Sequence, residues 1–195
     1  MLKRKASISM QMVLLISSVA LATGCGAGAG EDLNGTWATS CFYTGASHAR
    51  TVLTYTDLAL KGNYTEYDDE SCTNAIHSSD WTGTVEVSGK TEAGDTKIDI
   101  AFATFTSTPL TADNAALNNG YYYCGFSDWE ANVEKDVLGA DCYGYSIPVG
   151  GKSLDIYRIT EDTLLFGTDA PIGTDLTEDQ RPTTIDETRV FTRQE

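Results

Sequence analysis

Hydrophobic and polar residues alternate along most of the chain beyond residue 33. Successive side chains of a β-strand point to opposite faces, so this two-residue period is typical of strands buried on one side. The segments between the alternating stretches resemble turns, among them Lys61-Gly62-Asn63. Eight or more short strands at this spacing predict an all-β fold, either an antiparallel barrel or a β-sandwich. The clearest alternating stretches, rich in residues that favour strands, are 51–60, 81–87, 97–105, 154–159 and 164–166.

Helical periodicity is confined to two short segments. Residues 111–118 could form one or two turns, with Thr111 or Asp113 as the N-terminal cap. Residues 128–138 could form another helix, because apolar residues recur there every four positions. One or two short helices are therefore expected beside the sheet. The apolar residues of the second segment are Trp129, Val133 and Val137.

The last part of the chain is rich in Pro, Gly, Thr and Asp. Residues 169–187 therefore predict a long loop, followed by a short final strand at 189–193. No repeat and no second boundary is evident after residue 33. We expect residues 33–195, about 160 residues, to form a single β-rich domain, because a chain of that length can bury a substantial core.

The first 24 residues have the pattern of a secretory signal peptide. Lys3, Arg4 and Lys5 give a positive start, and residues 8–22 carry no charge. This apolar run of about 15 residues is shorter than the roughly 20 that an α-helix needs to cross a bilayer. A cleaved signal peptide over residues 1–24 is therefore expected rather than a retained membrane helix.

The apolar run ends at Leu21-Ala22-Thr23-Gly24-Cys25, which resembles the lipobox of bacterial lipoproteins. The resemblance implies that Cys25 is lipidated and becomes the first residue of the mature chain. It also implies a place in the bacterial cell envelope, anchored to the outer membrane, because Gly26 rather than aspartate follows Cys25. The alternative is an ordinary signal peptide that leaves Cys25 as a free thiol. Residues 25–32 are small and then acidic, which predicts a flexible tether.

The chain is strongly acidic. It has 13 basic and 28 acidic residues, a formal net charge of −15, and removal of the signal peptide would take away three of the basic ones. Such a surface repels phosphate backbones, so binding to nucleic acid is not expected. The negative charge has two possible roles. It could keep an exported domain soluble, or some of the carboxylates could bind cations.

Five cysteines are present, and four remain when Cys25 is set aside. An even number is typical of disulfide bonds in an oxidising compartment. Three pairings are possible, of which we favour the two between neighbours, Cys41 with Cys72 and Cys124 with Cys142. A zinc site is not favoured, because the spacings lack a C-x-x-C pattern.

Aromatic residues concentrate around the second cysteine pair. Consecutive tyrosines on a strand point to both faces, so some of them must face solvent or line a cavity. These rings could cap one end of a barrel, or they could recognise an apolar ligand, a glycan or another envelope protein. The candidate ligand-binding residues are Tyr121, Tyr123, Trp129, Tyr143 and Tyr145.

Catalytic patterns are missing from the sequence. The two histidines, His48 and His77, lie in polar settings and are expected at the surface. Neither G-x-S-x-G nor H-E-x-x-H occurs. We therefore expect no enzyme, no cofactor and no catalytic metal, although the acidic residues 169–179 could bind calcium weakly.

The tripeptide Gly35-Thr36-Trp37 resembles the G-x-W signature of lipocalins and related calycin barrels. That resemblance implies an up-and-down barrel of about eight strands, with Trp37 closing one end. It also implies a cationic partner over the Trp37 ring, supplied by Arg189 or Arg193. If the strands form a sandwich instead, Trp37 is an ordinary core residue.

The layout of the chain is also similar to that of lipocalin-like bacterial lipoproteins. The shared features are G-T-W-x-x-x-C at residues 35–41, a Tyr- and Asp-rich segment at 64–72, and Arg181-Pro182-Thr183. The resemblance implies a membrane-anchored envelope protein that binds a small apolar or aromatic ligand. The alternative is a structural or protein-interaction module with a filled core. In both cases we expect a monomer held at the membrane by the lipid on Cys25.

Overall fold

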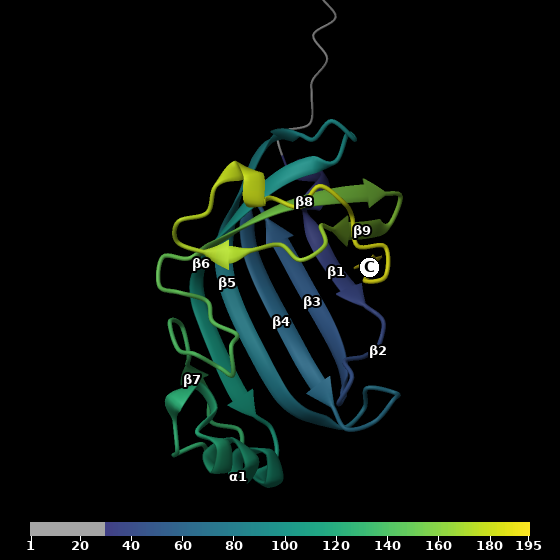
Figure 1. Cartoon of the computed structure of the whole chain (residues 1–195). Coiled ribbons are helices and arrows are strands. Elements are labelled where there is room, and N and C mark those ends of the chain that lie inside the picture. Colours follow the sequence, from purple (N-terminus) through teal and green to yellow (C-terminus); the bar gives the residue numbers. More distant parts are fainter. Residues whose placement is uncertain (1–29) are drawn as a thin grey trace, which may run out of the picture.

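Eight antiparallel strands close into a barrel in the computed structural model, which describes residues 30–195 (Figure 1). Each strand pairs with the next one of the eight along the chain, and the last pairs with the first, where Trp37 lies opposite Arg193. The prediction of an all-β barrel is therefore confirmed, and the sandwich alternative is wrong. The eight strands are β1 Gly35–Thr39, β3 His48–Thr56, β4 Ala59–Tyr67, β5 Ala75–Lys90, β6 Thr96–Pro109, β8 Lys152–Thr160, β9 Thr163–Phe166 and β11 Phe191–Gln194.

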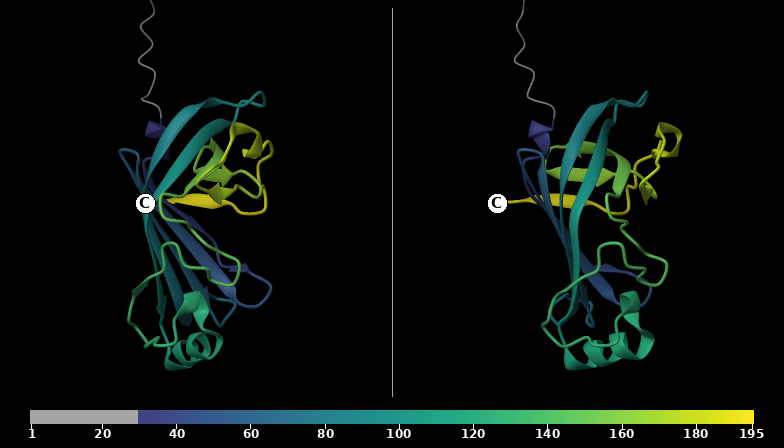
Figure 2. Two further views of the ribbon diagram at one scale, coloured as in Figure 1. Left: turned by 60° about the vertical axis from the view of Figure 1, so that its left-hand side comes forward. Right: turned by 90° about the vertical axis from the view of Figure 1, so that its left-hand side faces the viewer.

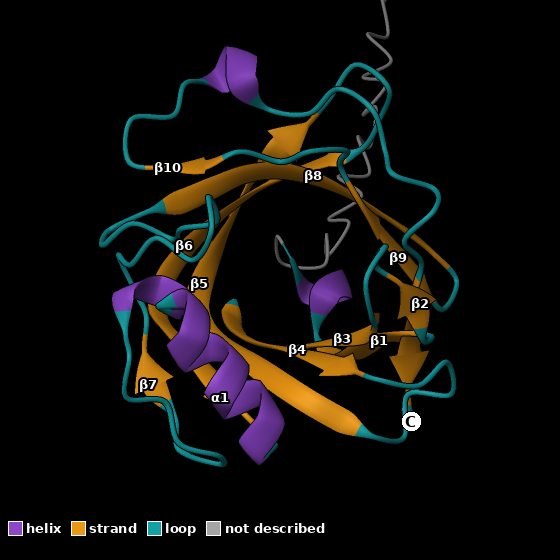
Figure 3. Ribbon diagram, turned by 60° about the horizontal axis from the view of Figure 1, so that its bottom comes forward, coloured by secondary structure: helices purple, strands orange, loops and turns teal. Residues whose placement is uncertain are grey.

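Short elements decorate the barrel. Strand β2 (Phe42–Tyr43) pairs with β3, β7 (Lys135–Asp136) with β6, and β10 (Ile172–Gly173) with β8. The α-helix α1 covers part of one opening of the barrel, while the 3-10 helix η1 lies at the other end (Figure 3). The helical elements are η1 Glu31–Leu33, α1 Ala112–Tyr121, η2 Tyr123–Gly125 and η3 Glu178–Gln180.

The wall of the barrel has unequal height. Strands β5 and β6 are 16 and 14 residues long, whereas β9 and β11 have four residues each. The long strands therefore extend well beyond the short ones on one side of the molecule (Figure 2). Two long connections, 110–151 and 167–190, lie beside the low part of the wall. This asymmetry leaves the interior accessible from one side.

A tight turn divides the segment 51–60, which the sequence predicts as one strand. Asp57 and Leu58 have φ of 47° and 68°, and they connect β3 to β4. The predicted turn at 61–63 is wrong as well, because these residues lie inside β4. Gly62 occupies a strand there because it lies opposite Trp81, whose ring fills the space of a β-carbon.

Helix α1 confirms the prediction for residues 111–118. Thr111 is its cap, and the Thr111 hydroxyl accepts a hydrogen bond of 3.1 Å from the Asn114 amide. The predicted helix at 128–138 is wrong. The amides of Asn132 and Val137 donate to carbonyl oxygens of β6, so strand β6 binds backbone groups of this segment that a helix would have used internally.

Arg181 fixes the long connection 167–190 to the barrel. Its side chain is 5% exposed and donates to the carbonyl oxygens of Ile98 and Asp155, at 2.9 and 2.7 Å. It also pairs with Asp99 and Glu178 at 2.7 and 2.9 Å. A buried cation of this kind needs such partners. The connection therefore covers the outer face of β8 as a fixed layer, in agreement with the long loop predicted at 169–187 (Figure 3).

Trp37 closes the η1 end of the barrel. It is completely buried, and its indole nitrogen donates to the Leu33 carbonyl oxygen at 2.7 Å. Of the two arginines considered from the sequence, the structure places Arg193 over this ring, 4.0 Å from its centroid. Arg189 is not part of this plug. It lies over Phe42 instead, at 5.2 Å, because it precedes β11 and stands at the other side of the low wall.

Two disulfide bonds have the predicted pairing. Cys41 bonds to Cys72, and Cys124 bonds to Cys142. The first joins the start of the β2 hairpin to the loop between β4 and β5, and the second holds together the connection between β6 and β8. Both therefore restrain irregular segments, which gain little from strand pairing.

The predicted signal peptide and Cys25 lie outside the described residues. The described chain contains no helix that is long and apolar enough to cross a membrane. The predicted tether 25–32 extends too far, because residues 31 and 32 already belong to η1. The Asp32 carboxylate accepts a hydrogen bond of 2.9 Å from the Tyr157 hydroxyl, which ties this residue to the barrel. The folded part thus begins at η1.

Candidate functional site

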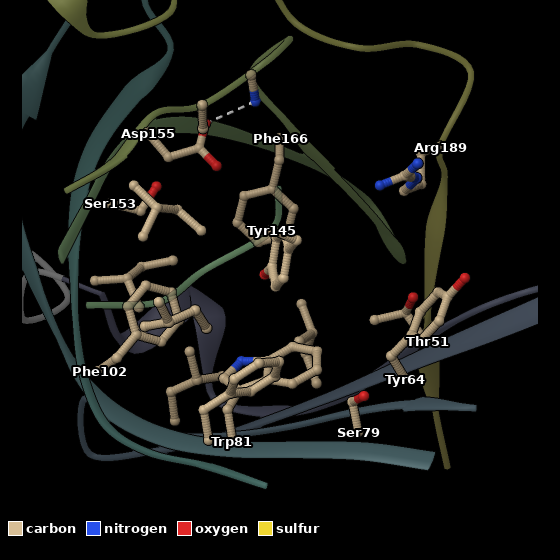
Figure 4. A pocket seen from close by; sticks show the side chains of 18 of the residues that line it. Thr51, Tyr64, Ser79, Trp81, Phe102, Tyr145, Ser153, Asp155, Phe166 and Arg189 are labelled. Atoms are coloured by element: carbon tan, nitrogen blue, oxygen red, sulfur yellow. Dashed lines mark hydrogen bonds between the residues drawn. The ribbon is translucent and has the colours of Figure 1, made fainter. Parts of the chain in front are cut away.

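A cavity of about 740 Å³ occupies the interior of the barrel between the Trp37 plug and the α1 end (Figure 4). Its walls come from inward-facing residues of β3, β4, β5, β6 and β8, and from the connections on the low side of the barrel. The core residues on the plug side and those beneath α1 form two separate clusters. Trp81 and Phe102 pack against both clusters and line the cavity between them.

Aromatic rings form much of the cavity wall. Trp81 and Phe102 extend from the long strands β5 and β6, and Phe166 faces them from the end of β9 (Figure 4). All three are only half-buried, which is unusual for large rings inside a barrel and reflects the empty space beside them. Such a wall suits an apolar or aromatic molecule.

Two of the tyrosines named from the sequence line this cavity, Tyr123 and Tyr145. Tyr145 packs edge-on against Phe105, with ring centroids 5.9 Å apart, yet it is 50% exposed. The cavity is therefore open to solvent beside Tyr145. Burial raises the pKa of both tyrosines, so both hydroxyls stay protonated at neutral pH.

The other three aromatic candidates do not line the cavity. Trp129 is 3% exposed and packs beneath α1, where its indole nitrogen donates to the Tyr123 carbonyl oxygen at 3.1 Å. Tyr121 and Tyr143 lie on the outer surface, more than 60% exposed, and the Tyr143 hydroxyl donates to the Tyr121 carbonyl oxygen. These rings were grouped because they lie near the Cys124–Cys142 pair in the sequence. In the structure they lie on α1 and on the irregular segment that follows it, where Trp129 is buried and the two tyrosines are exposed.

The residues that sequence reasoning missed lie on the strands. Trp81, Phe102 and Phe105 belong to stretches predicted as strands. Strict alternation would place Phe102 and Phe105 on opposite faces, but a β-bulge between them, where the pairing of β5 and β6 shifts register, lets both line the cavity. A closed barrel would direct one of these faces inward. The strands themselves were predicted from the sequence. The short length of β9 and β11, which leaves the interior unfilled, was not.

One buried carboxyl group lies in the wall of the cavity. Asp155 on β8 is 7% exposed, and its Oδ1 accepts hydrogen bonds from the Ile156 and Gly167 amides at 2.7 and 2.9 Å. Burial raises its pKa to about 7, although the two amides and Arg181 act in the opposite direction. Asp155 is therefore divided between its neutral and charged forms near neutral pH.

Charged groups also stand at the open side of the cavity. Asp169 and Asp186 come from the 167–190 connection, and Arg189 precedes β11. Hydrogen bonds from Thr188 lower the pKa of Asp186, and the Arg189 guanidinium contributes. On β4 beside them, burial and the nearby Glu66 raise the pKa of Tyr64 to about 12. The mouth is thus polar while the interior is aromatic.

His77 is buried, so the expectation of a surface position is wrong for it. Its two ring nitrogens lie 2.8 Å from the Ser107 hydroxyl and 3.0 Å from the Asn114 side-chain oxygen. The order Ser, His, Asn matches that of a nucleophilic triad. However, Ser107 is 1% exposed and does not line the cavity. The three residues instead link α1 to β5 and β6.

A metal site was not expected, apart from weak calcium binding at 169–179. Within residues 30–195, no three His, Cys, Asp or Glu side chains form a group that could hold a metal ion. No family model matches the sequence, and a comparison with curated proteins finds no match. The geometry on its own describes a site that could enclose a small, mostly apolar molecule and offer it one buried carboxyl group.

Proposed function

We propose that this chain is a lipid-anchored protein of the bacterial envelope whose barrel binds a small apolar or aromatic molecule. The observation that supports binding is the cavity of about 740 Å³ with an aromatic wall. Ligand sites of known proteins are mostly apolar clefts of roughly 300 to 1,000 Å³ with a few polar groups. A barrel with a filled core would have left no such space.

Binding is tested with N-phenyl-1-naphthylamine, an uncharged dye whose emission rises in an apolar site. Ser79 lines the cavity from β5, so Ser79→Phe places a ring in the space that the ligand would take. Thr84→Phe is the matched control, because Thr84 is on the same strand but exposed. We expect Ser79→Phe to weaken dye binding at least tenfold and Thr84→Phe to leave it unchanged.

The tryptophans give a second readout of the same experiment. Trp37 and Trp129 are buried in the two core clusters, and Trp81 is the one that lines the cavity. A ligand inside the barrel should change the emission of Trp81, and Trp81→Phe should abolish that change. Dye binding that is equal in Ser79→Phe and in the unmodified protein would contradict the proposal. Native mass spectrometry of the purified domain would identify a ligand retained from the cell.

The membrane anchor rests on the sequence around Cys25, which lies outside the described residues. The folded domain starts at η1, only a few residues after Cys25, so the cavity would stay close to the membrane. Radiolabelled palmitate should be incorporated into the full-length protein and not into Cys25→Ser. A Cys25→Ser variant that still fractionates with membranes would refute the anchor.

A second candidate function is that of a protein-interaction module. Exposed rings near the Cys124–Cys142 disulfide favour it, since large apolar side chains at a surface often mark contact sites. Tyr121, Tyr122 and Tyr143 are each more than 60% exposed, and Val149 is 72% exposed. A partner that dissociates on Tyr143→Ser but not on Ser79→Phe would support this function independently of the cavity.

A further inference from the structure

Asp155 presents one unused carboxylate oxygen to the cavity. Both backbone amides that bind this side chain, those of Ile156 and Gly167, donate to Oδ1. Oδ2 receives no hydrogen bond from any of the residues 30–195, and Figure 4 shows it pointing toward the interior, above Phe166 and Tyr145. Oδ2 is therefore free to bind a group inside the cavity, and a ligand that supplies a donor to this charged oxygen would be stabilised here.

Tyr55 is a second unsatisfied polar group in the same wall. It is 2% exposed and lines the cavity from β3, and its hydroxyl has no hydrogen-bond partner among the described residues. Burial raises the pKa of Tyr55, and the nearby charge of Asp155 raises it further. Both groups lie in the wall of the same cavity. Unpaired buried hydroxyls are rare in folded proteins, which makes this end of the cavity unusual.

The charge around Asp155 is not balanced by a dedicated cation. Arg181 approaches it from outside the barrel, but it donates to the Asp155 carbonyl oxygen and pairs with the carboxylates of Asp99 and Glu178. Arg189 is at the exposed mouth, over the ring of Phe42.

The cavity lining holds three carboxyl groups and one guanidinium, and the whole chain has a net charge of −15. This field attracts cations and repels anions on their way to the cavity. The three carboxyl groups are those of Asp155, Asp169 and Asp186.

We propose that the ligand is an amphiphilic amine, a small molecule with an aromatic or aliphatic body and one protonated amino group. The ammonium group would donate to Asp155 Oδ2 and to the Tyr55 hydroxyl oxygen. The body would lie against Trp81, Phe102 and Phe166. This inference rests on the proposed function, because it specifies what the same cavity binds.

An ammonium group fits this site better than a neutral polar group. A buried carboxylate is stabilised most by an opposite charge within hydrogen-bond distance, because desolvation penalises the unpaired ion. A hydroxyl group can donate one hydrogen bond but brings no charge. A carboxylate on the ligand would face Asp155 as a like charge. The faces of the surrounding aromatic rings would add a further attraction for a cation.

Calorimetric titration with three ligands that share one body separates these cases. The ligands are 4-phenylbutylamine, 4-phenylbutanol and 4-phenylbutanoate, each measured at pH 8 with the unmodified domain, Asp155→Asn and Glu92→Gln. Glu92 is an exposed carboxylate in the β5–β6 turn, so Glu92→Gln controls for the loss of one negative charge. Tyr55→Phe removes the unpaired hydroxyl and leaves the ring.

We expect the amine to bind at least tenfold more tightly than the alcohol, and the carboxylate to bind most weakly. Asp155→Asn should weaken the amine at least tenfold and leave the alcohol within threefold, whereas Glu92→Gln should change neither by more than twofold. Tyr55→Phe should weaken the amine severalfold.

Equal binding of amine and alcohol, or an amine that is unaffected by Asp155→Asn, would overturn the amine inference and leave the proposed function standing. If neither the three ligands nor the uncharged dye binds or alters Trp81 emission, both the amine inference and the proposed function are refuted.

Discussion

Replacing Asp155 by asparagine should stabilise the protein at high pH and have little effect at low pH. Asparagine has nearly the same shape, and its side-chain oxygen can still accept from the Ile156 and Gly167 amides. What it removes is the ability to become charged inside the barrel. The variant therefore isolates the free energy of ionising one buried group.

The magnitude follows from the proton affinity of Asp155 in the folded and unfolded chain. Burial raises its pKa from the ordinary 3.8 to about 7, so between these values the folded protein holds a proton that the unfolded chain has released. Stability must then fall as pH rises through this window. At about 1.4 kcal/mol for each pKa unit, the total loss is roughly 4 kcal/mol. Arg181 and the two amides, which favour the charged form, are already included in the value of about 7.

Urea unfolding at several pH values between 4 and 8.5, with both disulfide bonds intact, measures this effect. The free energy of unfolding of Asp155→Asn should match that of the unmodified protein near pH 4 and exceed it by roughly 4 kcal/mol above pH 8. Glu92→Gln shows how much any lost charge contributes, since Glu92 is exposed. A difference between Asp155→Asn and the unmodified protein that is the same at pH 4 and pH 8 would refute the reasoning.

Two further predictions concern the frame of the barrel. Gly62→Ala should lower the free energy of unfolding in urea by about 1 to 3 kcal/mol, because the new methyl group meets the Trp81 ring. Gly120→Ala is the control and should not lower it, because Gly120 is exposed on α1 with open space beside it. Equal effects of the two substitutions would contradict the packing argument. Arg193→Gln should cost about 1 to 3 kcal/mol, because it removes the cation over the plug tryptophan and hydrogen bonds to two carbonyl oxygens. A larger loss in Arg189→Gln than in Arg193→Gln would reverse the assignment of the plug.

Local features of the sequence were sufficient where the physical cause is itself local. Alternation gives strands because side chains of a pleated backbone alternate, and Thr111 caps α1 through a bond to an amide three residues away. The favoured pairing of Cys124 with Cys142 also had a local reason, since this bond joins the ends of a segment that would otherwise be poorly restrained. The errors at 61–63 and 128–138 have the opposite origin. Gly62 lies inside a strand because the Trp81 ring on the next strand fills the space of a β-carbon. Residues 128–138 are held by hydrogen bonds to carbonyl oxygens of β6.

Strand β8 shows most clearly what the sequence alone did not predict. Its alternation of Ser153, Leu154, Asp155 and Ile156 predicts a strand with an apolar face inward and a polar face outward. In the structure the polar residues Ser153 and Asp155 line the cavity, while Leu154 and Ile156 are buried without lining it. The reason is the 167–190 connection, which covers the outer face of β8 and makes that face the apolar one.

The sequence by itself therefore determined most of the strands, the short helix α1 and the strong negative charge, and it favoured the disulfide pairing that the structure has. These depend on periodicity, composition and short-range bonds. Only the tertiary structure decided which faces point inward, which arginine covers Trp37, and that the interior holds an open cavity with Asp155 in its wall. Those features depend on the relative lengths of strands far apart in the chain and on what covers each face, and no local pattern records either.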